Sequence, residues 1–229
     1  PLSSGDRRPL ISENKVGKSQ SIQNYSSLEP RISLNVLLGN TSSLKASYNR
    51  MTQYIHLLSN TAASSSLDVW TPSTNNIKPE IADAYVLGYF KNFKNNTYEA
   101  SLELYYKDLQ NQIDYIDGAD LLINKYIEGD LLTGIGRAYG LEFLFKKNRG
   151  RYNGWFSYTL GRSELKIDGI NKYEWYPTRY DQTHNIKITS TYKINDRVQI
   201  SGNFVYLTGT PVTFPSSKFV IQGFAIPHN

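Results

Sequence analysis

Closely spaced carboxylates are the first residues in this sequence that could carry chemistry. Glu99 and Glu103 share one face of an alternating segment and lie about 13 Å apart on an extended strand. A glycosidase needs its two carboxylates between about 5 and 10 Å apart, so we predict that this pair belongs to a polar strand face. The run 114–120 holds three carboxylates around a glycine. Its spacing differs from that of a calcium loop, so an ordinary acidic loop is the prediction.

Histidine, glycine and cysteine chemistry has little support either. The three histidines, His56, His184 and His228, are dispersed, and none stands in a serine–aspartate context that indicates a triad. No helix is predicted after the glycines of 134–140, so they do not form a phosphate loop. The chain has no cysteine, which excludes disulfides, zinc–cysteine sites and thiol nucleophiles. We therefore expect no enzyme, with no catalytic residue, no metal and no cofactor.

Aromatic residues in two predicted long loops are the best ligand candidates. They are Trp70, Tyr173, Trp175, Tyr176 and Tyr180. Exposed aromatic faces can stack on sugars or on flat chelates, and loops often carry recognition. The alternative is a membrane-interface girdle or a cluster that packs the loops together. Both interpretations stay open.

A polar motif precedes one of the predicted strands. It contains Arg179, Asp181 and His184. Arginine and aspartate can form a charge-assisted pair, and histidine can add hydrogen bonds. We predict a structural clasp that fixes a loop to the strands, with a ligand role as the alternative.

The composition limits the fold that positions these residues. The 229 residues include 25 basic and 20 acidic ones, a net charge of +5, and the excess is diffuse. No arginine-rich groove is evident, so we expect no nucleic-acid partner. Mean hydropathy is −0.47 and no apolar run is long enough for a transmembrane helix. A transmembrane strand, in contrast, needs only about 10 residues with every second one apolar, and the 18 tyrosines suit membrane interfaces.

Alternating apolar and polar residues predict long β-strands. In 97–107, Tyr98, Leu102 and Tyr106 fall on one face, while Glu99 and Glu103 fall on the other. The same alternation recurs in 31–38, 44–49, 139–146, 156–160, 186–192 and 198–206. The segment 82–93 is also strand-like, but its faces cannot be assigned. The sequence thus predicts about eight strands of about 10 to 12 residues, roughly twice the length usual in soluble proteins.

Short and long connections alternate strictly between these strands. Short polar turns are predicted at 39–41, 94–96, 148–150 and 195–196. Long connections are predicted near 55–80, 114–134, 164–183 and from 208 onwards. This alternation is typical of outer-membrane barrels, which have short periplasmic turns and long extracellular loops. We predict an all-β, antiparallel transmembrane barrel segment at 27–207, between an irregular extracellular segment at 1–26 and a truncated extracellular loop at 208–229.

Six stretches resemble the carboxy-terminal barrel of TonB-dependent outer-membrane transporters, particularly the Bacteroidetes-type receptors. They are 27–31 (SLEPR), 44–50 (LKASYNR), 77–80 (IKPE), 106–113 (YKDLQNQI), 136–142 (GRAYGLE) and 179–185 (RYDQTHN). The resemblance implies a Gram-negative outer-membrane receptor that imports a scarce nutrient: a siderophore, vitamin, glycan or peptide. It also implies partners beyond this chain: outer-membrane lipid, a plug domain, the remaining barrel strands and an inner-membrane energy-coupling protein that acts through the plug.

Two other architectures are weighed against this one. A small self-contained barrel for anchoring or adhesion would require the last strand to pair with the first. A soluble β-rich module that binds glycans would require Tyr98, Leu102, Leu104 and Tyr106 to face a second sheet. Strand length and the one-sided loops argue against the soluble module, and the resemblance argues against the small barrel.

Overall fold

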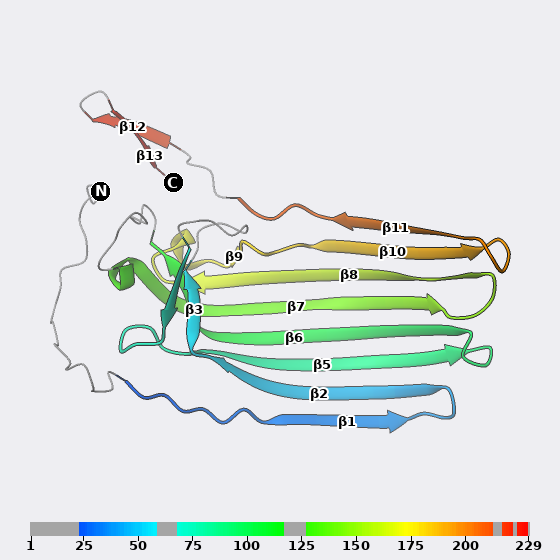
Figure 1. The fold of residues 1–229 in the computed structure, drawn as a ribbon. Coiled ribbons are helices and arrows are strands. Elements are labelled where there is room, and N and C mark those ends of the chain that lie inside the picture. The colour runs from blue at the N-terminus through cyan, green and yellow to red at the C-terminus, as the bar shows by residue number, and fades with distance from the viewer. Residues whose placement is uncertain (1–22, 59–67, 117–126, 213–216, 222–223, 229) are drawn as a thin grey trace.

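A single antiparallel meander dominates the fold. The computed structural model describes residues 23–58, 68–116, 127–212, 217–221 and 224–228. Its main sheet contains eight successive long strands: β1 (Arg31–Leu37), β2 (Ser42–Gln53), β5 (Glu80–Phe93), β6 (Tyr98–Tyr115), β7 (Leu131–Lys147), β8 (Tyr152–Ile167), β10 (His184–Lys193) and β11 (Gln199–Leu207). Each strand pairs with its neighbour along this list (Figure 1). The prediction of about eight long antiparallel strands is confirmed, and the register now assigns the faces of β5.

Smaller elements lie among the long connections. Two hairpins stand apart from the main sheet: β3 (Ile55–Leu58) with β4 (Val69–Pro72), and β12 (Ser217–Ile221) with β13 (Phe224–His228). The two-residue strand β9 (Tyr176–Pro177) pairs with β8, and there are two short 3₁₀ turns, η1 (Ile127–Asp130) and η2 (Asn171–Tyr173). Among the described residues, no helix is long and apolar enough to cross a membrane.

One face of the sheet is an apolar band. Directly paired residues of an antiparallel sheet share a face, and the register aligns Leu87, Leu104 and Leu141 across three adjacent strands. Leu104 is 49% exposed, so no second layer covers it within this part of the chain. A broad exposed apolar face marks a lipid or protein contact. The soluble-module prediction, in which Leu102 and Leu104 face a second sheet, is therefore wrong for the described residues.

Aromatic residues border this band on both sides. Four tyrosines stand side by side on adjacent strands: Tyr48, Tyr85, Tyr106 and Tyr139. Eight residues away along β6, Tyr98 lies beside Phe93 at the short-turn end. That separation is about 26 Å along the strand, and about 20 Å after a tilt of about 40°, close to the apolar thickness of outer-membrane barrels. The two aromatic rows are therefore the girdles of a membrane-spanning sheet.

The opposite face is largely polar and holds the paired carboxylates considered above. Glu103 lies directly opposite Glu142, and Glu99 pairs with Lys146. The predicted polar face is therefore confirmed, and it corresponds to the inner wall of the barrel. On the same face, Gly140 lies opposite Gly161. The hydroxyl of Tyr105 would stand 2.7 Å from a methyl group added at either glycine, so the tyrosine fills the space that both leave.

Tight turns join the strands at one end. Lys94, Asn95 and Asn96 have φ values of 47°, 53° and 62°, and Gly150 has a φ of 101°. These left-handed conformations let a strand reverse within few residues, and asparagine and glycine tolerate them well. All four short connections lie together at one end of the sheet (Figure 1).

At the other end the strands are longer than predicted. β6, β7 and β8 contain 18, 17 and 16 residues, because they continue into the connections expected at 114–134 and 164–183. Two small buried clusters stabilise these extensions. One contains Leu58, Ile77 and Leu131, and the other contains Leu132, Leu165 and Ile167. Packing of these apolar residues thus keeps the strands together where they extend beyond the membrane band.

The sheet is open within the described part of the chain. β1 pairs with β2 and β11 pairs with β10, and the eight strands do not close on one another. The small closed barrel required pairing of the first and last strands, so that alternative is wrong for the strands described here. The predicted segment 1–26 lies largely outside the described residues, as do 117–120 of the acidic run and the side chain of His228.

Candidate functional site

A row of charged residues lies just outside the tyrosine girdle, at the long-loop rim. The register aligns Arg50, Asp83, Asp108, Arg137 and Glu164 on five adjacent strands. Each is two residues beyond the aromatic row or its strand equivalent, so these charges stand outside the membrane band. The long loops therefore rise from a row of charged residues, here called the charge ring, in which Arg50 pairs with Asp83 and Arg137 with Glu164.

The first part of this ring is a bidentate pair. Arg50 donates to both oxygens of Asp83, from Nε at 2.8 Å and from Nη2 at 2.7 Å. Tyr48 also donates to Asp83 Oδ1 at 2.6 Å. Hydrogen bonds from Arg50, and then from Tyr48, hold the pKa of the Asp83 carboxyl below its ordinary value. Asp83 is buried, so these donors compensate a carboxylate withdrawn from water.

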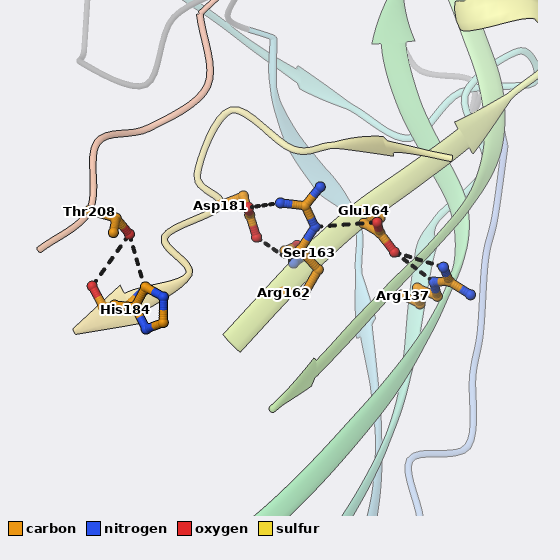
Figure 2. A network of polar contacts seen from close by, with 7 residues as sticks. All are labelled: Arg137, Arg162, Ser163, Glu164, Asp181, His184 and Thr208. Carbon is orange, nitrogen blue, oxygen red and sulfur yellow. Dashed lines mark hydrogen bonds and ion pairs between the residues drawn. The ribbon is translucent and has the colours of Figure 1, made fainter. Parts of the chain in front are cut away.

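The second part is a four-residue chain of alternating charge (Figure 2). Arg137 Nη2 lies 2.8 Å from Glu164 Oε2, Arg162 Nε lies 3.3 Å from Glu164 Oε1, and Arg162 Nη1 lies 2.8 Å from Asp181 Oδ2. Burial opposes ionisation of Glu164. Hydrogen bonds from the two arginines outweigh it and hold the pKa of this carboxyl below its ordinary value. The chain joins β7, β8 and the segment before β10.

Asp181 replaces a backbone acceptor along the edge of β8. Its Oδ1 accepts a 2.6 Å hydrogen bond from the Ser163 backbone N–H. Immediately beside this point, the backbone N–H of Thr178 donates to the Ser163 carbonyl. The backbone N–H of Gly161 donates to the Thr183 carbonyl. The side chain therefore continues the hydrogen bonding of β8 where the chain turns aside between β9 and β10.

The other residues of the predicted clasp lie nearby with different partners. The guanidinium of Arg179 lies 5.4 Å from the centre of the Tyr180 ring. The backbone N–H of His184 donates to Thr208 Oγ1 at 3.0 Å (Figure 2). The Nδ1 atom of His184 lies 2.9 Å from the Tyr158 hydroxyl. The partners of Asp181, Arg162 and the Ser163 amide, come from β8 and were not singled out from the sequence.

The five aromatic candidates lie at the same rim, and three of them contact cations. Lys166 Nζ stands 4.4 Å from the centre of the Tyr173 ring, and Arg137 stands 4.1 Å from that of Trp175. Tyr180 contacts Arg179, as described above. Tyr176 points elsewhere and donates to Asp114 Oδ2 at 3.0 Å. Trp70, in β4, is 67% exposed.

The sequence did not reveal the structural role of a buried histidine at the long-loop end of the sheet. His56 is 1% exposed, with Nε2 2.9 Å from Ser73 Oγ and Nδ1 3.4 Å from Glu80 Oε1. The order serine, histidine, carboxylate matches a hydrolase triad, but such a histidine must reach the substrate to transfer its proton. Because His56 is enclosed, we interpret it as a link between the β3–β4 hairpin and the start of β5.

The charge ring predicts a pH-dependent rim. The folded-state pKa values of Asp83 and Glu164 lie below their ordinary values of 3.8 and 4.5. The stabilisation by ionised carboxylates is therefore complete above about pH 5 and is lost as the pH falls through the folded-state values. Hydrogen exchange of β8 peptides, corrected for intrinsic rates, should show progressive loss of protection as the pH falls below about 5. β11 has no carboxylate and does not pair with β8, so it is the internal control; an equal loss in β8 and β11 would contradict this cause.

Comparison with known proteins agrees with this architecture. A family model described as TonB dependent receptor-like, beta-barrel, matches residues 6–225. The structure of the alcaligin outer membrane receptor FauA from Bordetella pertussis aligns with a TM-score of 0.53 at 16% identity, over 79% of this chain and 29% of that chain. A chain of the FpvAI–pyocin S2 complex aligns with a TM-score of 0.57 at 14% identity, over 82% of this chain and 24% of that one. No curated protein matches the sequence. The chain thus spans less than a third of either structure, and at these identities the likeness shows the fold.

Proposed function

The chain belongs to the TonB-dependent receptor β-barrel family, and from this premise we propose that the whole receptor imports a scarce nutrient captured at the long-loop rim. Members of this family are outer-membrane receptors and not enzymes, and the chain is a wall segment of such a barrel. In the proposed mechanism, the long loops capture the ligand and the polar inner wall lines its path through the barrel. An inner-membrane energy-coupling protein then displaces a plug domain so that the ligand can pass.

The observation that carries this proposal is the pairing of exposed rings with cations at the rim. Tyr173 and Tyr180 are at least half exposed, and each has a cationic side chain beside its ring. An aromatic face can stack on a flat ligand, and the adjoining cation attracts negative charge. Among the nutrient classes that the family resemblance implies, this favours a small anionic chelate over a neutral glycan. Trp175 is less accessible, because Arg137 covers its ring and is itself paired with Glu164.

The test uses the whole receptor, purified in detergent, with a panel of probes: ferric citrate, a ferric catecholate, a ferric hydroxamate, cyanocobalamin and maltohexaose. We expect a ferric chelate to bind, measured by quenching of tryptophan fluorescence. Tyr173→Ala and Tyr180→Ala should each weaken that binding about tenfold, the size of one ring–ligand contact. Tyr206→Ala, on the lipid-facing side of β11, is the control. Binding of maltohexaose alone, or equal losses in all three variants, would refute the proposal.

A further inference from the structure

Three arginines of the long-loop rim are neutralised by carboxylates, whereas Lys166 and Arg179 of that rim lie against aromatic rings. At the long-loop rim, Arg50, Arg137 and Arg162 each form an ion pair of 2.7 or 2.8 Å with a carboxylate. The short-turn rim holds eight cations: Lys91, Lys94, Lys146, Lys147, Arg149, Arg151, Lys193 and Arg197. Within the described chain, their ion pairs are those of Lys146 with Glu99 at 3.9 Å and of Lys193 with Asp196 at 3.7 Å. The short-turn rim therefore keeps an excess of positive charge.

Three of these cations gather on the lipid-facing side. Lys147 pairs in register with Tyr98, and Lys91 pairs with Ala100, so both share the face of the apolar band. Lys94 lies in the turn between β5 and β6, and its Nζ lies 5.8 Å from the centre of the Tyr98 ring. Lys147 Nζ lies 5.7 Å from the same ring and 5.5 Å from that of Tyr152. Lys91 Nζ flanks them, 6.0 Å from the Phe93 ring.

The surface beside these lysines changes within one or two residues from charged to apolar. On the same face, the residues that follow Tyr98 in β6 and precede Lys147 in β7 are Ala100 and Phe145. The apolar band begins with these two residues. Cations at the aromatic girdle of a membrane sheet stand at the depth of the headgroups, while the adjoining residues face acyl chains. The surface thus matches a molecule with an anionic head and an apolar tail.

We propose that Lys91, Lys94 and Lys147, around the rings of Tyr98 and Tyr152, bind the headgroup of an anionic phospholipid in the leaflet on the short-turn side. In this site the lysine ammonium groups contact the phosphate, and the apolar band contacts the acyl chains. The rings of Tyr98 and Tyr152 lie between them, at the depth of the membrane interface. This site is separate from the ligand surface at the long-loop rim and does not depend on the identity of the imported nutrient.

The experiment is native mass spectrometry of the whole receptor after delipidation, with phosphatidylglycerol or phosphatidylethanolamine added back at equal concentration. The wild type should retain phosphatidylglycerol preferentially. The triple variant Lys91→Gln/Lys94→Gln/Lys147→Gln should retain phosphatidylglycerol at least tenfold more weakly than the wild type, since each interfacial lysine strengthens lipid binding about fivefold. Lys94→Gln alone, in an exposed turn, should lose about fivefold, and heat-modifiable migration on gels verifies that each variant is folded.

The matched control removes the same charge from the inner wall. Lys45→Gln/Lys107→Gln/Lys187→Gln changes three lysines whose register places them on the polar face. The control should retain phosphatidylglycerol within about twofold of the wild type, because its charges are screened from the lipid by the sheet. Equal losses in both triple variants, or equal retention of the two lipids by the wild type, would overturn the proposal. Displacement of the lipid by millimolar inorganic phosphate would assign a free-phosphate site and overturn it too.

Discussion

Gly140→Ala should destabilise the barrel by about 3 kcal/mol, enough to reduce the ratio of folded to unfolded receptor more than a hundredfold. A methyl group at this position would lie 2.4 Å from the backbone oxygen of Leu160 and 2.7 Å from the Tyr105 hydroxyl. The tyrosine can rotate away, but the carbonyl belongs to the adjacent strand. The sheet must therefore spread at the β7–β8 pairing, which weakens hydrogen bonds in a membrane where water cannot replace them. Urea unfolding in detergent, followed by loss of heat-modifiable migration, measures the change.

Gly161→Ala is the matched control for this prediction. Gly161 lies directly opposite Gly140, and its added methyl group would meet the Tyr105 hydroxyl at 2.7 Å but the nearest backbone oxygen only at 3.9 Å. We expect a cost of about 1 kcal/mol, relieved when Tyr105→Ala is combined with it. Tyr105→Ala should not rescue Gly140→Ala, because the contact with Leu160 remains. Equal effects at the two glycines, or rescue of both, would show that the tyrosine and not the backbone sets the cost.

The second large effect is expected at Asp181. Asp181→Ala leaves the Ser163 N–H without its acceptor and removes one partner of Arg162, at a position that is 4% exposed. The carboxylate is buried but the Arg162 side chain is 38% exposed, so we expect a cost of about 2 kcal/mol, much of it from the unsatisfied Ser163 N–H. Because the pair joins the segment before β10 to the edge of β8, the loss should appear as local opening of 168–183. Limited proteolysis within that connection and hydrogen exchange of the Ser163 amide both report it.

Asp181→Asn separates the two contributions. The asparagine carbonyl can still accept from Ser163, whereas the charge attracting Arg162 is gone, so we expect a cost of about 1 kcal/mol. The Ser163 amide should then remain largely protected while it exchanges freely in Asp181→Ala. If both variants expose 168–183 equally, the charge pair alone holds the connection, and the proposed replacement of a backbone acceptor is incorrect.

The strands were predictable because the membrane imposes a period of two on them. Tyr98, Leu102 and Tyr106 alternate with polar residues since one side of β6 meets lipid and the other faces the inner wall. The faces of β5 could not be assigned, because Ala82, Ala84 and Gly88 break the contrast between the two classes. The strand ends were underestimated for a related reason. Beyond the girdle the apolar side reverses, and Leu165 and Ile167 are buried on the inner face.

The sequence motif pointed to the segment that contains Asp181 and His184, but not to the residues that they contact. Asp181 and His184 were identified from a motif close to β10, but Arg162 and Glu164 belong to an ordinary alternating strand and carry no local signal. Only the register, which sets Arg137 beside Glu164, reveals the charge ring. His56 was similarly hidden, because its contacts with Ser73 and Glu80 depend on how the β3–β4 hairpin folds back. Pairings between distant segments are decided by tertiary packing, which residue types alone do not encode.

The meander has a consequence for the order in which the barrel forms. Apart from the inserted β3–β4 hairpin and β9, each strand of the sheet hydrogen-bonds to the strand that precedes or follows it along the chain. Contact order is therefore low for a β-protein, and each hairpin can close without waiting for a distant partner. The sheet can grow by addition of one hairpin at a time, with β1 and β11 as its two growing edges. A kinetic defect at the β7–β8 pairing would then leave the sheet assembled from β1 to β7, with the edge of β7 unpaired, which is the form most open to aggregation and to envelope proteases.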